Sequence, residues 1–123
     1  DGLQNINFIK LAAADAEGVT ASSPGLPLDA MPGGPTFKQK FESKYGPIQV
    51  YAPYAYDAVQ VLVAAMKKAD SEDPAKVLAA LPSTDIQGVT GQVRFDAKGD
   101  TQGGAVTLYV VKNGKWEVLE TVK

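Results

Sequence analysis

The strongest constraint on the fold is an Asn-Gly pair, Asn113 and Gly114, near the C-terminal end of the sequence. A two-residue hairpin turn needs positive φ angles, which asparagine and glycine tolerate better than other residues. The flanking runs, residues 110–112 and 115–118, are rich in valine and include a tryptophan, as expected of strands. The sequence therefore predicts a β-hairpin here.

The middle of the chain shows helical periodicity instead. Aromatic side chains recur at every fourth position from Phe37 to Tyr45, between Pro35 and Gly46, which are typical start and stop signals. We expect a helix there, with its aromatic stripe packed in a core. A longer helix follows, and its expected buried face comprises Tyr54, Ala58, Val61, Leu62, Ala65 and Met66.

Shorter elements flank these two helices. Asp73 and Pro74 form a cap and first-turn pair for a short helix that Pro82 ends. The apolar side of this helix is predicted to comprise Val77, Leu78 and Leu81.

The first 35 residues contain a helix, a strand and a loop. Asn5 or Asn7 is suited to cap the helix, and Gly18 supplies its stop. A short strand over residues 18–23 and an exposed loop rich in proline and glycine, residues 24–35, follow. The apolar positions of the helix are Phe8, Leu11 and Ala12.

After Thr90 the spacing of apolar residues changes from the helical period to a period of two, which indicates strands. Helices followed by strands predict an α/β architecture. Only two or three candidate strands precede the hairpin, however, and helices of this class need a sheet to cover. We therefore expect that most of the sheet lies outside this sequence.

Composition excludes several classes of function. The 12 basic and 14 acidic residues are too evenly balanced to attract nucleic acid through a long-range field. Cysteine and histidine are both absent, which removes thiolate nucleophiles, imidazole bases and the usual zinc ligands. No apolar run approaches the roughly 20 residues of a membrane-spanning helix. We expect a protein that is not an enzyme and has no catalytic residue, cofactor or metal site.

Two segments carry polar groups that could bind an ion or a ligand. Residues 95–100 place two carboxylates around a glycine, but lack the other oxygen ligands of a calcium loop, so a β-turn closed by Asp96 fits better. Gln49 and Tyr51 lie where an extended segment enters the long helix, and open α/β sheets bind ligands at such ends. Tyr54 and Tyr56, inside the helix, fit packing and ligand contact equally well.

Several motifs in order resemble one known family. They are the Asp-Gly pair at residues 1–2, the Glu-Gly-Val run at 17–19, the Tyr-Ala-Tyr-Asp-Ala run at 54–58 and the Phe-Asp-x-x-Gly-Asp turn at 95–100. Together they resemble the Leu/Ile/Val-binding proteins and their amide-binding relatives. The resemblance spans nearly the whole chain.

The resemblance implies the C-terminal part of a two-lobe, type I periplasmic-binding-protein fold, a parallel sheet flanked by helices, ending in the hairpin. Residues 1–23 then belong to the end of the second lobe and residues 24–103 to the C-terminal part of the first. Residues 104–123 make the last crossing at the hinge and the terminal hairpin. Family members trap a ligand between the lobes by hinge closure.

The resemblance also implies ligand-binding residues. Asp1 matches a cleft carboxylate that pairs with the α-ammonium group of an amino acid. Gln49, with Tyr51 beside it, matches a position that borders the side-chain pocket, where a glutamine is unusual for an aliphatic ligand. The donors for the ligand carboxylate lie outside this sequence.

The function implied is the solute-binding component of a periplasmic ABC transporter for branched-chain or related amino acids. Its partners are then the amino acid, the remainder of the two-lobe protein and a membrane permease. One alternative is an amide or amino-acid sensor of the same fold. Another is a fragment without ligand binding that forms homo-oligomers through the apolar faces of the helices containing Phe37 and Val61.

Overall fold

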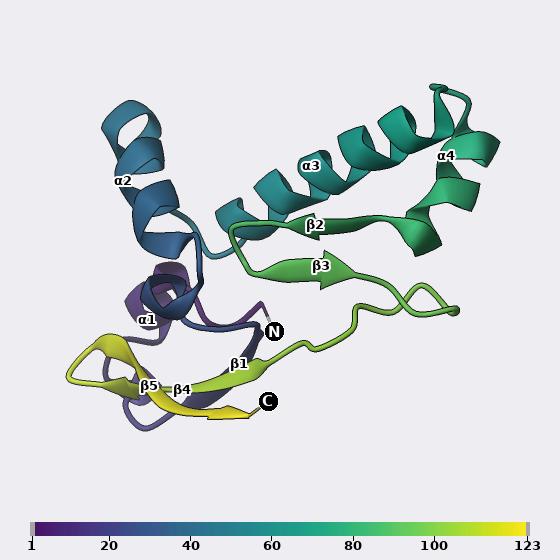
Figure 1. The fold of residues 1–123 in the computed structure, drawn as a ribbon. Helices are drawn as coiled ribbons and strands as arrows, with labels where there is room; N and C mark the ends of the chain where they lie inside the picture. The colour runs from purple at the N-terminus through teal and green to yellow at the C-terminus, as the bar shows by residue number, and fades with distance from the viewer. Residues whose placement is uncertain (1, 123) are drawn as a thin grey trace. The chain divides into compact units, whose positions relative to one another are not determined.

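The computed structural model describes residues 2–122, which form two compact units (Figure 1). The first, called the terminal unit, contains the described residues up to Pro27 together with those from Gly104 onward. The second, called the central unit, is Leu28–Gly103. Segments from opposite ends of the sequence therefore share one unit.

Helix α1 (Ile6–Ala12) opens the terminal unit, and a 3-10 turn, η1 (Ala13–Ala16), extends it. Asn5 is the cap, because its side-chain oxygen accepts a hydrogen bond of 3.0 Å from the backbone N–H of Phe8. Leu11 was predicted on the apolar side of this helix, and that prediction is wrong, because its side chain is 88% exposed. The short helix turns Ile9 toward the core instead.

The sheet of the terminal unit has the strand order β1-β4-β5, and both pairings are antiparallel. The turn between β4 and β5 consists of Asn113 and Gly114, with φ of 51° and 70°, which confirms the predicted hairpin. A small core of Ile9, Ala16 and Val111 joins the sheet to α1. The strands are β1 (Thr20–Pro24), β4 (Val106–Lys112) and β5 (Lys115–Val122).

Three helices dominate the central unit, as the sequence predicted: α2 (Gly34–Tyr45), α3 (Ala52–Ala69) and α4 (Pro74–Ala80). The side chain of Asp73 caps α4 by accepting hydrogen bonds from two backbone N–H groups, those of Ala75 and Lys76. Two 3-10 turns, η2 (Leu28–Ala30) and η3 (Leu81–Ser83), precede α2 and follow α4.

A hairpin of two short strands, β2 (Asp85–Gln87) and β3 (Gln92–Arg94), completes the central unit. Strand β2 was not predicted from the sequence, because three residues with one apolar side chain give no periodic signal. Asp96 closes the turn that follows, its carboxylate accepting from the N–H groups of Lys98 and Asp100 at 2.8 and 2.9 Å.

Burial on the helices of the central unit differs in part from expectation. Val61 and Ala65 of α3 are buried as predicted, whereas Leu62 and Met66 are 45% and 37% exposed. Leu78 of α4 is 67% exposed. Helix α3 is apolar around most of its circumference, so periodicity alone could not identify the covered side.

Every strand pairing within residues 2–122 is antiparallel, so the parallel sheet that the resemblance implies is not formed by these residues. The helices of the central unit are accompanied only by the β2–β3 hairpin. No helix of the described chain is long and apolar enough to span a bilayer.

Candidate functional site

The loop between α2 and α3 carries the two predicted ligand-binding residues that the structure describes. The side chain of Gln49 is exposed, and that of Tyr51 is 48% exposed. Their carbonyl groups accept hydrogen bonds from the N–H groups of Ala52 and Ala55, at 3.1 and 2.9 Å. The backbone of both residues is thus fixed by the start of α3, while their side chains reach solvent.

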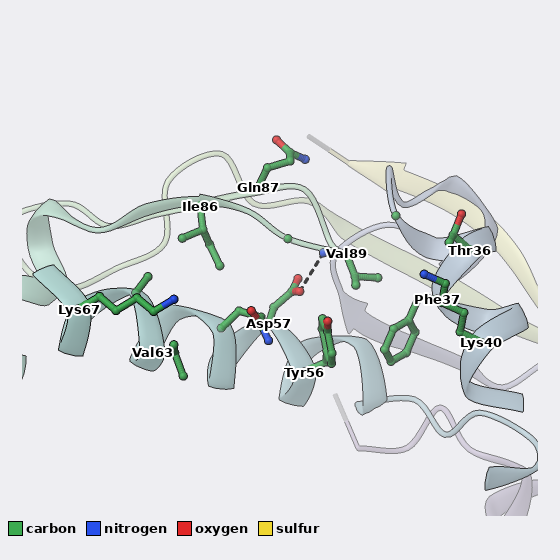
Figure 2. A pocket seen from close by; sticks show the side chains of 14 residues that line it. Thr36, Phe37, Lys40, Tyr56, Asp57, Val63, Lys67, Ile86, Gln87 and Val89 are labelled. Carbon is green, nitrogen blue, oxygen red and sulfur yellow. Dashed lines mark hydrogen bonds between the residues drawn. The ribbon is translucent and has the colours of Figure 1, made fainter. Parts of the chain in front are cut away.

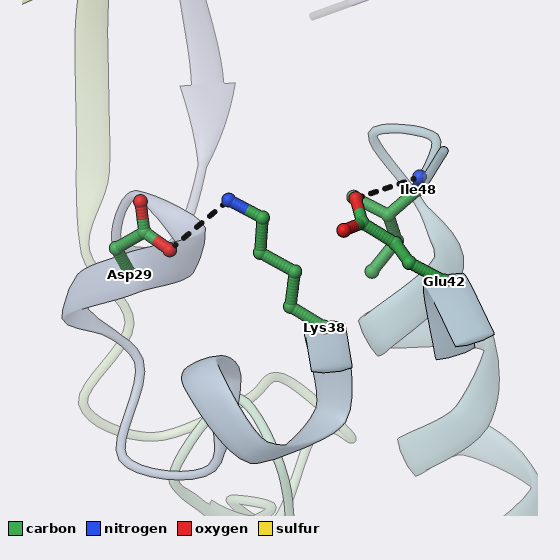
Figure 3. Close-up of polar contacts among 4 residues, drawn as sticks. All are labelled: Asp29, Lys38, Glu42 and Ile48. Carbon is green, nitrogen blue, oxygen red and sulfur yellow. Dashed lines mark hydrogen bonds and ion pairs between the residues drawn. The ribbon is translucent and has the colours of Figure 1, made fainter. Parts of the chain in front are cut away.

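Two polar contacts fix α2 to the segments on either side of it (Figure 3). The N–H of Ile48 donates to a carboxylate oxygen of Glu42 over 3.4 Å, which ties the loop carrying Gln49 to the helix. Lys38 pairs with Asp29 of η2 over 3.5 Å. Since both partners of this ion pair are largely exposed, it contributes about 0–1 kcal/mol to stability.

A hollow of about 460 Å³ lies between α2, α3 and the segment that joins β2 to β3 (Figure 2). It has the size of a small-molecule pocket. Neither Gln49 nor Tyr51 is among the residues that line it. Its wall combines aromatic, aliphatic and polar groups, among them Phe37, Lys40, Tyr56, Gln60, Val63 and Lys67.

Asp57 lies beside this hollow on α3 and is only 4% exposed. Its carboxylate accepts hydrogen bonds from the N–H groups of Val89 and Thr90, both at 2.8 Å, and from the Thr90 hydroxyl at 2.7 Å. A Cβ atom added to Gly88 would lie 2.5 Å from this carboxylate, so glycine permits the close approach. Asp57 therefore pins the β2–β3 turn to α3.

Asp57 belongs to the Tyr-Ala-Tyr-Asp-Ala motif at residues 54–58, but no role was predicted for it from the sequence. Its position was a usable signal, because it lies four residues after Pro53 and four before Val61, on the buried side of α3. A carboxylate at a buried position requires hydrogen-bond partners. Those partners come from more than 30 residues away, where no sequence pattern marks them.

The aromatic residues of the central unit pack on one another. The rings of Phe37 and Tyr56 have centroids 5.3 Å apart, and Phe37 also contacts Phe41 at 5.6 Å. Tyr45 continues the row beyond Phe41 at 5.1 Å. The aromatic stripe predicted on α2 thus packs in part against α3, and Tyr56 lines the hollow.

The third predicted ligand-binding residue, Asp1, lies outside the described residues. Gln49 and Tyr51 belong to the central unit. Among residues 2–122, no cluster of acidic side chains is arranged to hold a metal ion. In the terminal unit, burial raises the pKa of Tyr109.

Known proteins match this chain along most of its length. A family model described as "Periplasmic binding protein" matches residues 2–115. The Leucine-, isoleucine-, valine-, threonine-, and alanine-binding protein of Pseudomonas aeruginosa is 30% identical over 110 residues. That match covers 89% of this chain and 29% of the relative, so the chain corresponds to less than a third of the relative's length.

Two solved structures resemble this one over almost all of its length. A leucine binding protein, LivK, from Thermotoga maritima has a TM-score of 0.84 and 25% identity, covering 99% of this chain and 35% of that protein. LivJ from Streptococcus pneumoniae, a branched-chain amino acid transporter substrate binding protein in complex with isoleucine, has a TM-score of 0.82 and 28% identity. This match covers 99% of this chain and 35% of LivJ.

Proposed function

The chain belongs to the periplasmic binding protein family, and from that premise we propose that it forms part of the solute-binding component of an ABC transporter for branched-chain or related amino acids. The observation that carries the proposal is the structural similarity to the leucine binding protein of Thermotoga maritima, which covers 99% of this chain with a TM-score of 0.84. Solute binding, and not catalysis, is then the activity. The chain supplies the C-terminal part of the two-lobe protein.

We assign residues 1–23 to the end of the second lobe and residues 24–103 to the C-terminal part of the first. Residues 104–123 make the last hinge crossing and the terminal hairpin. The division of the chain after Pro27 and before Gly104 supports these boundaries to within a few residues. The ligand is held between the lobes and enclosed when the hinge closes.

Within this proposal, Asp1 pairs with the α-ammonium group of the ligand, and Gln49 and Tyr51 border its side chain. The exposure of Gln49 and Tyr51 supports their roles, because side chains that are already buried in the chain could not reach a ligand. The Gln49 amide can both donate and accept a hydrogen bond. It favours a ligand with a polar group, such as an amide or a hydroxyl, over a purely aliphatic one.

The other partners follow from the class of transporter. A binding protein of this kind delivers its ligand to a membrane permease, and its compartment is the periplasm. The proposed partners are therefore the amino acid, the remainder of the two-lobe protein and this permease.

Titration calorimetry on the two-lobe protein that contains this chain tests the function. We expect heat of binding with at least one of leucine, isoleucine, valine, threonine or a small aliphatic amide. The variant Asp1→Asn should weaken binding about 100-fold, since a desolvated ammonium loses its charged partner. Asp15→Asn, an exposed control, should bind normally.

Gln49→Leu refines the assignment of the pocket. It should shift preference toward leucine over threonine by roughly tenfold, whereas Gln39→Leu on the exposed side of α2 should leave preference unchanged. Absence of binding for every amino acid and amide would overturn the proposed function. Normal binding by Asp1→Asn would overturn only the role of Asp1.

A further inference from the structure

Thr107 is a fully buried polar residue of strand β4. Only one other residue of this strand has an exposed fraction of 0%, Val111, which is apolar and belongs to the small core. A buried hydroxyl destabilises a folded protein unless it forms hydrogen bonds. A valine would have nearly the same shape as Thr107 without that cost, so the role of Thr107 follows from the partners of its hydroxyl.

Two hydrogen bonds satisfy the Thr107 hydroxyl. It donates to the carbonyl of Gly25 over 2.8 Å, and the hydroxyl of Thr121 lies 3.0 Å away. Because the single proton of Thr107 points to Gly25, the Thr121 hydroxyl is the donor in the second bond. One side chain thus joins the segment that follows β1 to strands β4 and β5. These three residues are called the threonine clip.

The threonine clip lies at the end of the sheet where the chain leaves the terminal unit and returns to it. The unit ends at Pro27 and resumes at Gly104, so the clip begins two residues before the first point and three after the second. The N–H of Gly25 also donates to the carbonyl of Ala105 over 2.7 Å, one step beyond the last paired residues of β1 and β4. The two connections to the central unit are therefore fastened to each other just before they leave the terminal unit.

The connections are short beyond the clip. The outgoing one has Leu26 and Pro27 before the central unit begins, and the ring of Pro27 fixes its φ angle. The returning one passes through Gly103 and Gly104, where a Cβ atom would meet nothing within 4 Å. Glycines in such open surroundings rotate easily. A bend between the two units is thus concentrated in these few residues.

We propose that Thr107 is a positioning residue for closure of the lobes, because its hydroxyl makes the two connections move together. Without the clip each connection rotates by itself, so the open state gains arrangements that the closed state does not have. The closed state then holds a smaller share of the molecules, and a ligand enclosed by it binds more weakly by the same factor. This effect on the ligand rests on the proposed function, whereas the coupling of the two connections does not.

Titration calorimetry of the two-lobe protein with leucine and with threonine tests the effect on the ligand. Thr107→Val keeps the shape of the side chain and removes the hydroxyl, so it should raise both dissociation constants about tenfold. Thr121→Val, which removes only one of the two bonds, should raise them about threefold, and Thr107→Ser, which keeps the hydroxyl, should change them less than about twofold. The preference between leucine and threonine should stay the same, because the clip does not touch the ligand.

Val111→Ala separates this role from a general loss of stability. It weakens the core of the same unit but leaves the threonine clip in place, so the folded variant should bind both amino acids normally. If Val111→Ala and Thr107→Val weaken binding equally, Thr107 is merely structural and the proposal is wrong. Normal binding by Thr107→Val would also overturn it.

A second measurement needs no ligand. The chain has no cysteine, so spin labels can be attached through Asp15→Cys in the terminal unit and Glu72→Cys in the central unit, both exposed positions. Any cysteine elsewhere in the two-lobe protein is replaced by serine. Double electron–electron resonance of the ligand-free protein then gives the distribution of distances between the labels.

We expect a broader distribution of distances with Thr107→Val than in the parent, and an unchanged one with Val111→Ala. Identical distributions for the parent and Thr107→Val would overturn the proposal, whether or not an amino acid binds. A parent protein that binds no amino acid would instead count against the proposed function, and the spin labels would still decide whether the clip couples the two connections.

Discussion

The terminal unit and the central unit are stabilised in different ways. In the terminal unit, segments from both ends of the chain bind one another: the Trp116 indole N–H donates to the carbonyl of Asn5 over 2.9 Å. Glu17 accepts from the N–H of Asn113 at 3.0 Å, directly at the hairpin turn. Its core residue Val111 is fully buried, although other apolar side chains of the unit, such as Leu11 and Val118, are exposed.

The central unit has local helices and few long-range contacts by comparison. Its hairpin is held against α3 by the carboxylate of Asp57. A backbone hydrogen bond of 3.0 Å from the N–H of Gly33, the residue before α2, to the carbonyl of Val89 ties the same hairpin to α2. Large apolar side chains of α3, among them Val59 and Leu62, are exposed. The difference teaches that pairing between distant segments stabilises the terminal unit, whereas the central unit depends on local helices and on a few contacts of its hairpin.

The largest effect is expected at the carboxylate that holds the central unit together. Asp57→Ala removes the acceptor of two backbone N–H groups and a hydroxyl, so it should lower the free energy of unfolding of the two-lobe protein by about 3 kcal/mol. Urea unfolding measures it, with the exposed Glu72→Ala as control. A loss below about 0.5 kcal/mol would show that the unit does not depend on this contact.

The terminal unit should be most sensitive at its core. Val111→Ala creates a cavity between the sheet and α1 and should cost about 2 kcal/mol, since the site is fully buried. Val118→Ala, on the neighbouring strand and 51% exposed, is the control and should cost much less. Equal losses in the two variants, measured by urea unfolding, would contradict the assignment of the core.

A smaller effect is expected at the contact between Glu17 and the hairpin turn. Glu17→Ala leaves the turn in place but removes the acceptor for the N–H groups of Asn113 and Gly114, and should cost about 1 kcal/mol. Hydrogen exchange at those two amides should accelerate. Glu117→Ala, exposed on β5, should change neither quantity.

The smallest effect concerns Tyr109, a partly buried tyrosine of the terminal unit. Because burial raises the pKa of Tyr109, the folded state holds this proton more tightly than the unfolded state does. Its contribution to stability is present below pH 10 and is lost as the pH rises through the folded-state pKa. Stability should fall less steeply above pH 10 in Tyr109→Phe; identical profiles would contradict this.

Local signals predicted much of the fold. Asn113 and Gly114 specify their turn by their own backbone preferences, and Asp73 caps its helix through its two nearest N–H groups. Asn5 caps α1 in the same way as Asp73 caps α4, by accepting a hydrogen bond from the N–H of Phe8. These features depend on neighbours in the sequence, which is why they could be recognised there.

Features that depend on distant partners could not be predicted in this way. The covered side of α3 is chosen by α4 and β2, so Leu62 and Met66 were assigned to the wrong side. Strand β2 exists because β3 pairs with it. For the site, Gln49 and Tyr51 were predicted from their place before α3, and Gln49 also from a resemblance. Their contacts with a ligand stay a prediction, because these contacts require the rest of the protein.

Hydrogen exchange of the isolated 123-residue chain tests most directly whether the two units are stabilised in different ways. The account predicts that amides of β1 and β4 exchange at least about tenfold more slowly than those in the middle of α3, because β4 is paired with a strand on each side whereas only one side of α3 is buried. In the two-lobe protein, α3 should gain protection while β4 changes little. Equal protection of α3 and β4 in the isolated chain would contradict the account.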